Sequence, residues 1–205
     1  MRQSIYISIT LVFFLLLNGC TDSTSVEEVN TSAIQQLEEL GIEINSDSFI
    51  QQIEKNNNPV VVLFIKAGID PNIPNKHGEI SIVKASINGN DDLVQLLINS
   101  GASVNLPNSN GTTALMAASA NKNLKTVLLL LKNEADVHAK DNEGYNALML
   151  AIRNGDLEVM KALLDAGSDA NLPEGENKED LLQFTEKIFP ETGQLLEEYK
   201  KERNN

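Results

Sequence analysis

The chain has 205 residues, of which 41% are hydrophobic and only 4% aromatic, and its formal net charge is −13. A core of small aliphatic residues suits close helix-on-helix packing better than a β-sandwich. The acidic excess repels phosphate backbones, so we do not expect nucleic acid as a partner. Solubility is the simpler explanation of the acidity, and a basic surface on a partner protein is the alternative.

The N-terminus has the pattern of a secretory signal. Met1-Arg2 gives a positive start, and residues 5–17 form an apolar run. The run is shorter than the roughly 20 residues that a membrane-spanning helix needs, but it suits the apolar region of a cleaved signal. It ends at Leu17-Asn18-Gly19-Cys20, which resembles the lipobox of bacterial lipoproteins.

The lipobox resemblance implies that a signal peptide over residues 1–19 is removed and that the Cys20 thiol carries diacylglycerol. An acyl chain such as palmitate on the new amino group would complete the anchor, since each buried CH₂ contributes about 0.8 kcal/mol. An ordinary cleaved signal and an uncleaved short anchor are the alternatives. Thr21 replaces the usual inner-membrane retention Asp of Gram-negative lipoproteins, which implies a bacterial cell envelope protein on the outer membrane, facing the periplasm.

The next segments connect the anchor to the folded part. Residues 20–30 are polar and without periodicity, so we interpret them as the lipidated cysteine and a flexible tether. Residues 31–44 are a candidate N-terminal capping helix, which Thr31 and Ser32 begin and Gly41 ends.

Residues 45–176 repeat at a fixed spacing of 33 residues, as the positions of Gly78, Gly111 and Gly144 show. A second set with the same spacing is Gly68, Gly101, Glu134 and Gly167, and an apolar set is Leu97, Leu130 and Leu163. Such a period predicts a stacked array whose successive units bury one continuous core. Residues 177–205 are a degenerate copy that predicts a C-terminal capping repeat, with Pro190 opening its second helix.

Each unit is expected to contain two short helices. The first helices are expected over residues 80–87, 113–120 and 146–153, and the second helices over residues 91–100, 124–133 and 157–166. Thr113 and Asn146 are expected to cap their helices. Ile80 cannot cap, which leaves Ser81 as the candidate one residue later.

These units resemble the ankyrin repeat. The family's Gly-x-Thr-Pro-Leu-His-x-Ala-Ala run appears as Gly111-Thr-Thr-Ala-Leu-Met-Ala-Ala, and its Gly-Ala-Asp-x-Asn tail as Gly167-Ser-Asp-Ala-Asn. The resemblance implies an all-α solenoid of stacked helix pairs with short β-turn or hairpin loops and helical caps. The departures are Met116 and Met149 in place of the family histidine, and Lys122 and Glu134 in place of glycines. A left-handed Glu134 should cost about 1 kcal/mol.

The residues give no support for catalysis. The single cysteine is assigned to lipid and excludes an internal disulfide. His77 and His138 occupy different positions in their repeats, and neither has metal ligands at a suitable spacing. We therefore expect no enzyme, no cofactor and no metal site, with a pH-sensing His77 as an alternative role.

In ankyrin arrays, partners dock in a concave groove lined by the hairpin tips and the exposed side of the first helices. The resemblance implies these partner-binding residues: Lys76, His77, Glu79, Asn88, Asn110, Thr112, Asn121, Asn142, Glu143, Tyr145, Arg153 and Asn154, with Ile87, Ser109 and Ala120 beside them. Tyr145 with Arg153 is the best candidate pair, because interfaces favour these residue types. The alternative is that all of them are solvated turn residues.

The expected function is therefore a monomeric, membrane-anchored module that binds another protein. The alternative is a structural cell-envelope lipoprotein with no dedicated groove partner.

Overall fold

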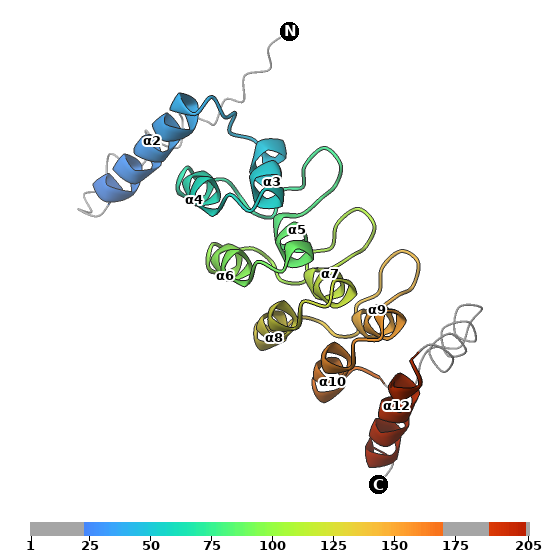
Figure 1. The fold of residues 1–205 in the computed structure, drawn as a ribbon. Helices are drawn as coiled ribbons and strands as arrows, with labels where there is room; N and C mark the ends of the chain where they lie inside the picture. The colour runs from blue at the N-terminus through green and yellow to red at the C-terminus, as the bar shows by residue number, and fades with distance from the viewer. Residues whose placement is uncertain (1–22, 170–188, 204–205) are drawn as a thin grey trace.

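The structure is a computed structural model that describes residues 23–169 and 189–203. Within these ranges the chain forms ten helices and no β-strand. The first helices of the units are α3 (Ser46–Glu54), α5 (Ser81–Asn88), α7 (Ala114–Ala120) and α9 (Ala147–Asn154). The second helices are α4 (Asn58–Lys66), α6 (Asp91–Asn99), α8 (Leu124–Lys132) and α10 (Leu157–Asp165). Figure 1 shows the two sets as separate rows, with hairpin loops extending from the side of the first helices. The predicted all-α solenoid is confirmed.

The three expected helix pairs begin and end within one residue of the predicted positions. Two of the predicted caps are confirmed, since Thr113 accepts from the N–H of Met116 and Asn146 from that of Met149. Ser81 is not a cap. It is fully buried, and its hydroxyl donates to the carbonyl of Pro71 at 2.7 Å, which ties α5 to the preceding hairpin instead.

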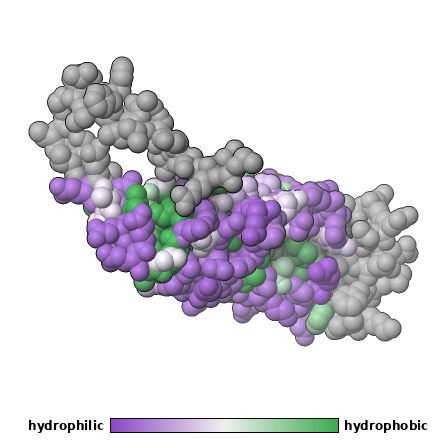
Figure 2. Space-filling view, turned by 90° about the horizontal axis from the view of Figure 1, so that it is seen from above, coloured by the Kyte–Doolittle hydropathy of each residue, from purple (hydrophilic) through white to green (hydrophobic). Residues whose placement is uncertain are grey.

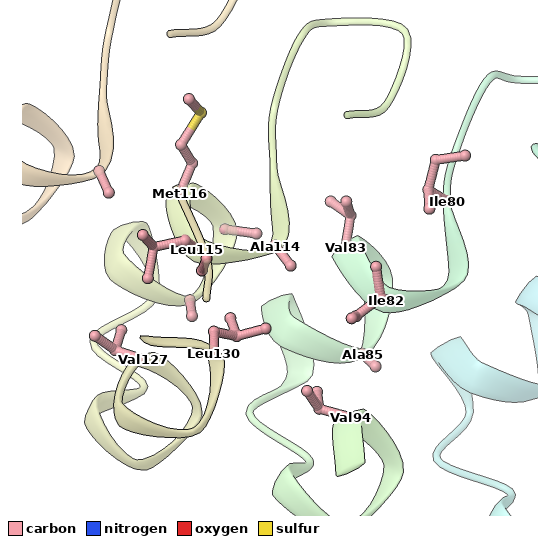
Figure 3. Close-up of a cluster of buried hydrophobic side chains, with 14 of the residues drawn as sticks. Ile80, Ile82, Val83, Ala85, Val94, Ala114, Leu115, Met116, Val127 and Leu130 are labelled. Carbon is pink, nitrogen blue, oxygen red and sulfur yellow. The ribbon is translucent and has the colours of Figure 1, made fainter. Parts of the chain in front are cut away.

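One continuous core runs through the array. The side chains of Leu97, Leu130 and Leu163 are completely buried and belong to a single apolar cluster, which confirms their predicted alignment. The position of the family histidine is also apolar and buried in three units, where it holds Val83, Met116 and Met149. In Figure 3, Val83 and Met116 point toward the hairpin side, away from Leu130 on the second helix. Apolar packing therefore replaces the polar contacts that a histidine would make there.

The N-terminal helix is longer than the sequence predicts. A tether over residues 20–30 and a helix from residue 31 are expected, but α2 (Ser23–Glu39) begins at Ser23, so the prediction of a tether is wrong from that residue on. No proline or glycine interrupts this stretch. Once the buried Ala33 and Leu37 fix the helix, each further residue adds a hydrogen bond at little cost. The predicted end is confirmed, with Gly41 at a φ of 67°.

The C-terminal helix α12 (Pro190–Arg203) begins at the predicted proline and packs against α10. Its Leu196 is only 2% exposed, and the Tyr199 hydroxyl donates to Asp165. The first helix expected for this cap, around Leu181, Leu182 and Phe184, lies outside the described residues.

The surface is largely polar. Figure 2, the face seen from above Figure 1, is mostly hydrophilic over the described residues, with apolar side chains in a few separate areas. No helix in the described ranges is long and apolar enough to cross a membrane. Among the residues whose burial the structure describes, the exposed large apolar side chains are Val29, Leu40, Ile73, Ile87 and Leu128.

Candidate functional site

The hairpin tips are built by one repeated side chain. Asn75, Asn108 and Asp141 recur at the 33-residue spacing, and the side-chain oxygen of each accepts two backbone N–H groups of its own hairpin at 2.9–3.0 Å. The backbone closes each hairpin as well, as in the bond from Asn108 N to the Thr112 carbonyl at 3.0 Å. Three hairpins of one shape therefore line one side of the array. These three residues were not among the predicted binding residues, although their 33-residue spacing indicates a shared structural role.

Neighbouring hairpins are joined into a continuous wall. Ser109 N donates to the Gly78 carbonyl at 2.9 Å, and Asn142 N donates to the Asn110 carbonyl at 3.0 Å. Gly111 is required here, because its φ is 79° and a Cβ atom would lie 2.8 Å from the backbone nitrogen of Asn142. Two tip side chains strengthen the wall, since the Asn142 amide donates to the Ser109 carbonyl at 3.1 Å and the Ser109 hydroxyl donates to the His77 carbonyl at 3.3 Å. The predicted binding residue Asn142 therefore also holds two hairpins together.

The groove that the ankyrin resemblance predicts has the C-terminal ends of the first helices as its floor, and this surface is called the groove below. Two predicted binding residues at this floor use their side-chain amides to bond the preceding unit. Asn88 donates to the Ile53 carbonyl at 3.0 Å, and Asn154 donates to the Ala120 carbonyl at 2.7 Å. Asn121 is exposed and donates to the Ala117 carbonyl of its own helix at 2.8 Å. The amides of Asn88 and Asn154 therefore link adjacent units.

An ion cluster occupies the N-terminal end of the groove. The Lys84 ammonium lies 2.8 Å from Glu54 of α3 and also contacts Glu79 of the hairpin, while its side chain is only 17% exposed. Lys76 lies 3.7 Å from Asp47 at the edge of the same area. An open depression of about 410 Å³ lies beside these groups. It is lined by Asp47, Ser48, Gln51, Glu54, Asn75, Lys76, His77 and Glu79.

Two members of this cluster, Glu79 and Lys84, have shifted pKa values. The hydrogen bond from Lys84, helped by one from the Asn75 amide, lowers the pKa of the Glu79 carboxyl below its ordinary value despite partial burial. Burial opposes the charge on Lys84, but the hydrogen bonds to Glu54 and Glu79 outweigh it and raise the pKa of the Lys84 ammonium. Glu79 and Lys84 are therefore charged together at neutral pH, and the contacts of Lys84 connect α3, the hairpin and α5.

The C-terminal end of the groove carries the predicted aromatic–arginine pair. The guanidinium carbon of Arg153 lies 5.9 Å from the centre of the Tyr145 ring, within the range of a cation–π contact. Tyr145 is half-buried against the core, whereas Arg153 is exposed. The structure thus brings together the two residues that the sequence singled out.

The other predicted residues divide between the wall and the edge of the groove. Lys76, His77, Asn110, Asn142 and Glu143 are exposed at the tips, and Glu79 and Thr112 are half-buried where the hairpins return to the helices. His138 lies away from these tips in the segment after α8, and its N–H donates to Asp136 at 2.8 Å. In the described ranges, no group of three or more His, Cys, Asp or Glu side chains is arranged to hold a metal ion.

No curated protein shows significant similarity to this sequence. The family model for ankyrin repeats, three copies long, matches residues 49–141 and again residues 85–174. The two matches together span more than half of the chain and include every helix pair, hairpin and groove residue described above from Phe49 onward, and the chain therefore belongs to the ankyrin-repeat family.

Proposed function

We propose that this protein is a lipid-anchored, non-catalytic interaction module that binds a partner protein through its concave groove. Ankyrin repeats support the general part of this proposal, a module for protein–protein interaction. The observation that supports the groove as the binding surface is the Tyr145–Arg153 contact, in which the guanidinium carbon lies 5.9 Å from the ring centre. Tyrosine and arginine are the residue types that most often dominate binding energy at protein interfaces.

The rigid construction of the groove supports the same proposal. Backbone hydrogen bonds join successive hairpins, and Asn88 and Asn154 bond the floor of one unit to the next. A surface held in this way loses little conformational entropy when a partner binds, so more of the contact energy appears as affinity. The module would act as a monomer, with one partner in each groove.

The anchor is proposed from the sequence alone. The apolar run over residues 5–17 and the sequence Leu17-Asn18-Gly19-Cys20 support cleavage before Cys20 and its lipidation in a bacterial cell envelope. We place the protein on the outer membrane, facing the periplasm, on the basis of Thr21 after the cysteine. Two or three acyl chains would hold it there.

The anchor is tested with Cys20→Ser in the full chain. We expect the wild type in the membrane fraction and the variant in the soluble fraction, with metabolic labelling by a palmitate analogue lost. A variant that stays in the membrane fraction without label would show that an uncleaved segment, not a lipid, holds the protein.

The groove is tested by crosslinking in intact cells. A photoreactive residue at position 121, exposed at the end of α7, should capture one protein, whereas the same residue at position 161, exposed on α10 beside α12, should not. The double variant Tyr145→Ala, Arg153→Ala should abolish capture from position 121, and its melting temperature should fall because Tyr145 packs against the core. The single variant Arg153→Ala, which truncates an exposed side chain, should weaken capture while leaving the melting temperature unchanged. Identical capture from both positions in both backgrounds would instead favour the structural envelope lipoprotein.

A further inference from the structure

One row of equivalent positions crosses the floor of the groove from end to end. Residues 54, 87, 120 and 153 lie at the 33-residue spacing, near the ends of α3, α5, α7 and α9. These positions hold Glu54, Ile87, Ala120 and Arg153. Ile87 is 40% exposed, which is unusual for a large apolar side chain in this array. The row is thus acidic at one end, apolar in the middle and basic at the other end.

The two charged ends differ in how their charges are neutralised. At the α3 end, the carboxylates of Glu54 and Glu79 share the single ammonium of Lys84, which leaves a net negative charge. At the α9 end, no carboxylate of the described residues lies within ion-pair distance of Arg153, and the Tyr145 ring lies 5.9 Å from its guanidinium carbon. Arg153 therefore offers an uncompensated positive charge in a chain whose net charge is −13.

The contact with Tyr145 favours one kind of ligand for Arg153. The guanidinium carbon of Arg153 lies over the Tyr145 ring, and its N–H donors bond no acceptor of the described residues, so they can match the two oxygens of a carboxylate. Holding the arginine side chain in advance also lowers the entropy lost on binding. The overall negative charge does not prevent such a contact, because charges beyond a Debye length of about 8 Å are screened at physiological ionic strength.

On the basis of the proposed function, we propose that the groove receives an extended segment of the partner that carries a carboxylate for Arg153 and an apolar side chain for Ile87. The two sites are two helix spacings apart, roughly 16–20 Å at the usual packing distance of 8–10 Å. An extended chain advances about 3.3 Å per residue, so the two side chains lie about five or six residues apart. The segment has one direction, because its carboxylate is repelled at the end that holds Glu54 and Glu79.

The probe for this proposal is a library of random 12-residue peptides displayed on phage, selected against the immobilised full chain. Selection is repeated on the Arg153→Glu variant, with Lys161→Glu, at an exposed position of α10 beside α12, as the matched charge control. We expect wild-type selections to be enriched in Asp or Glu about five or six positions from an apolar residue. Arg153→Glu should replace the acidic preference with Lys or Arg, and Lys161→Glu should leave it unchanged.

Affinities of one selected peptide then separate the two ends of the site. Arg153→Gln should weaken binding about tenfold, and so should exchange of the peptide carboxylate for an amide, with no further loss when both changes are combined. Ile87→Ser should weaken binding without changing the acidic preference. Equal melting temperatures of all variants exclude unfolding as the cause.

Three results would overturn the proposal. These are selected peptides with no acidic preference, a preference for basic residues that Arg153→Glu does not alter, and a failure to select any peptide that competes at the groove. If crosslinking from position 121 still captures a protein in these cases, the interaction module stands and only the chemistry assigned to its partner is wrong. If that capture also fails, the proposed function falls with it.

Discussion

At the residue scale, two of the three described non-glycine residues with a positive φ lie in one unit of the array, and the third is Asn56, a residue type that tolerates this region. Lys122 and Glu134 have positive φ angles of 60° and 61°, at positions where the other units have glycines such as Gly89 and Gly101. The left-handed region costs a residue with a Cβ atom about 1 kcal/mol more than it costs glycine. The unit over residues 111–143 is therefore predicted to be the weakest link of the central array.

Glu134→Gly should raise the free energy of unfolding by about 1 kcal/mol. Glu134 is exposed, so little packing is lost, and glycine adopts its φ of 61° without strain. Glu158→Gly is the matched control, because Glu158 is exposed in the first turn of α10 and glycine should cost about 1 kcal/mol there. Urea denaturation of both variants checks this, and a destabilised Glu134→Gly would show that its side chain makes a contact worth more than the strain.

At the scale of helices and hairpins, the sequence predicts the helices and caps that recur in each unit, but few of the contacts between units. The periodicity predicts both ends of each central helix to within one residue, and Thr113 and Asn146 cap their helices as predicted. Ser81 fails as a cap because its hydroxyl finds the Pro71 carbonyl, ten residues away in the chain. The pairing of Tyr145 with Arg153 was predictable, because the two lie on one side of one unit.

Contacts that join different units could not be deduced in the same way. Lys84 of α5 contacts Glu54 of α3 in the preceding unit, and the Asn88 amide donates to the Ile53 carbonyl, 35 residues earlier. Such pairs depend on how far one unit is shifted and twisted against the next, which periodicity alone does not fix. They nevertheless decide which predicted groove residues are free to bind and which hold the array together.

The ion cluster that joins α3, the hairpin and α5 should make stability depend on acid pH through Glu79. Its pKa in the folded chain is lower than the ordinary 4.5, so its contribution is complete above that value and is lost as pH falls through the folded-state pKa. Glu79→Gln should therefore lower the melting temperature at pH 7. The difference from wild type should shrink steadily below pH 4.5. The exposed Glu143→Gln is the control, and an unchanging difference for Glu79→Gln between pH 7 and pH 3 would contradict a stabilising charge.

At the scale of the whole molecule, the chain is a one-dimensional stack in which each helix pair touches only its neighbours. The first helices pack in sequence from α3 through α5 and α7 to α9, and α12 packs on α10 at the C-terminal end. In such an array, stability is close to a sum of unit and interface terms, so a lost end exposes the next unit without unfolding the distant ones. The C-terminal cap therefore protects the groove indirectly, because α12 supports α10 and α10 supports α9 with its Arg153.

Removal of the C-terminal cap should loosen the α9–α10 unit before any other. Ending the chain after residue 188 removes α12 and with it the buried Leu196, which should cost about 2 kcal/mol or more and expose apolar surface of α10. Hydrogen exchange should rise in α9 and α10 but not in α5, and sedimentation should show self-association. Leu196→Asp in the full chain should reproduce the exchange pattern, whereas Glu198→Ala, exposed on the same helix, should not. Unchanged exchange in α10 after truncation would mean that the described contacts of α12 do not stabilise the array, and that the helix serves some purpose other than capping.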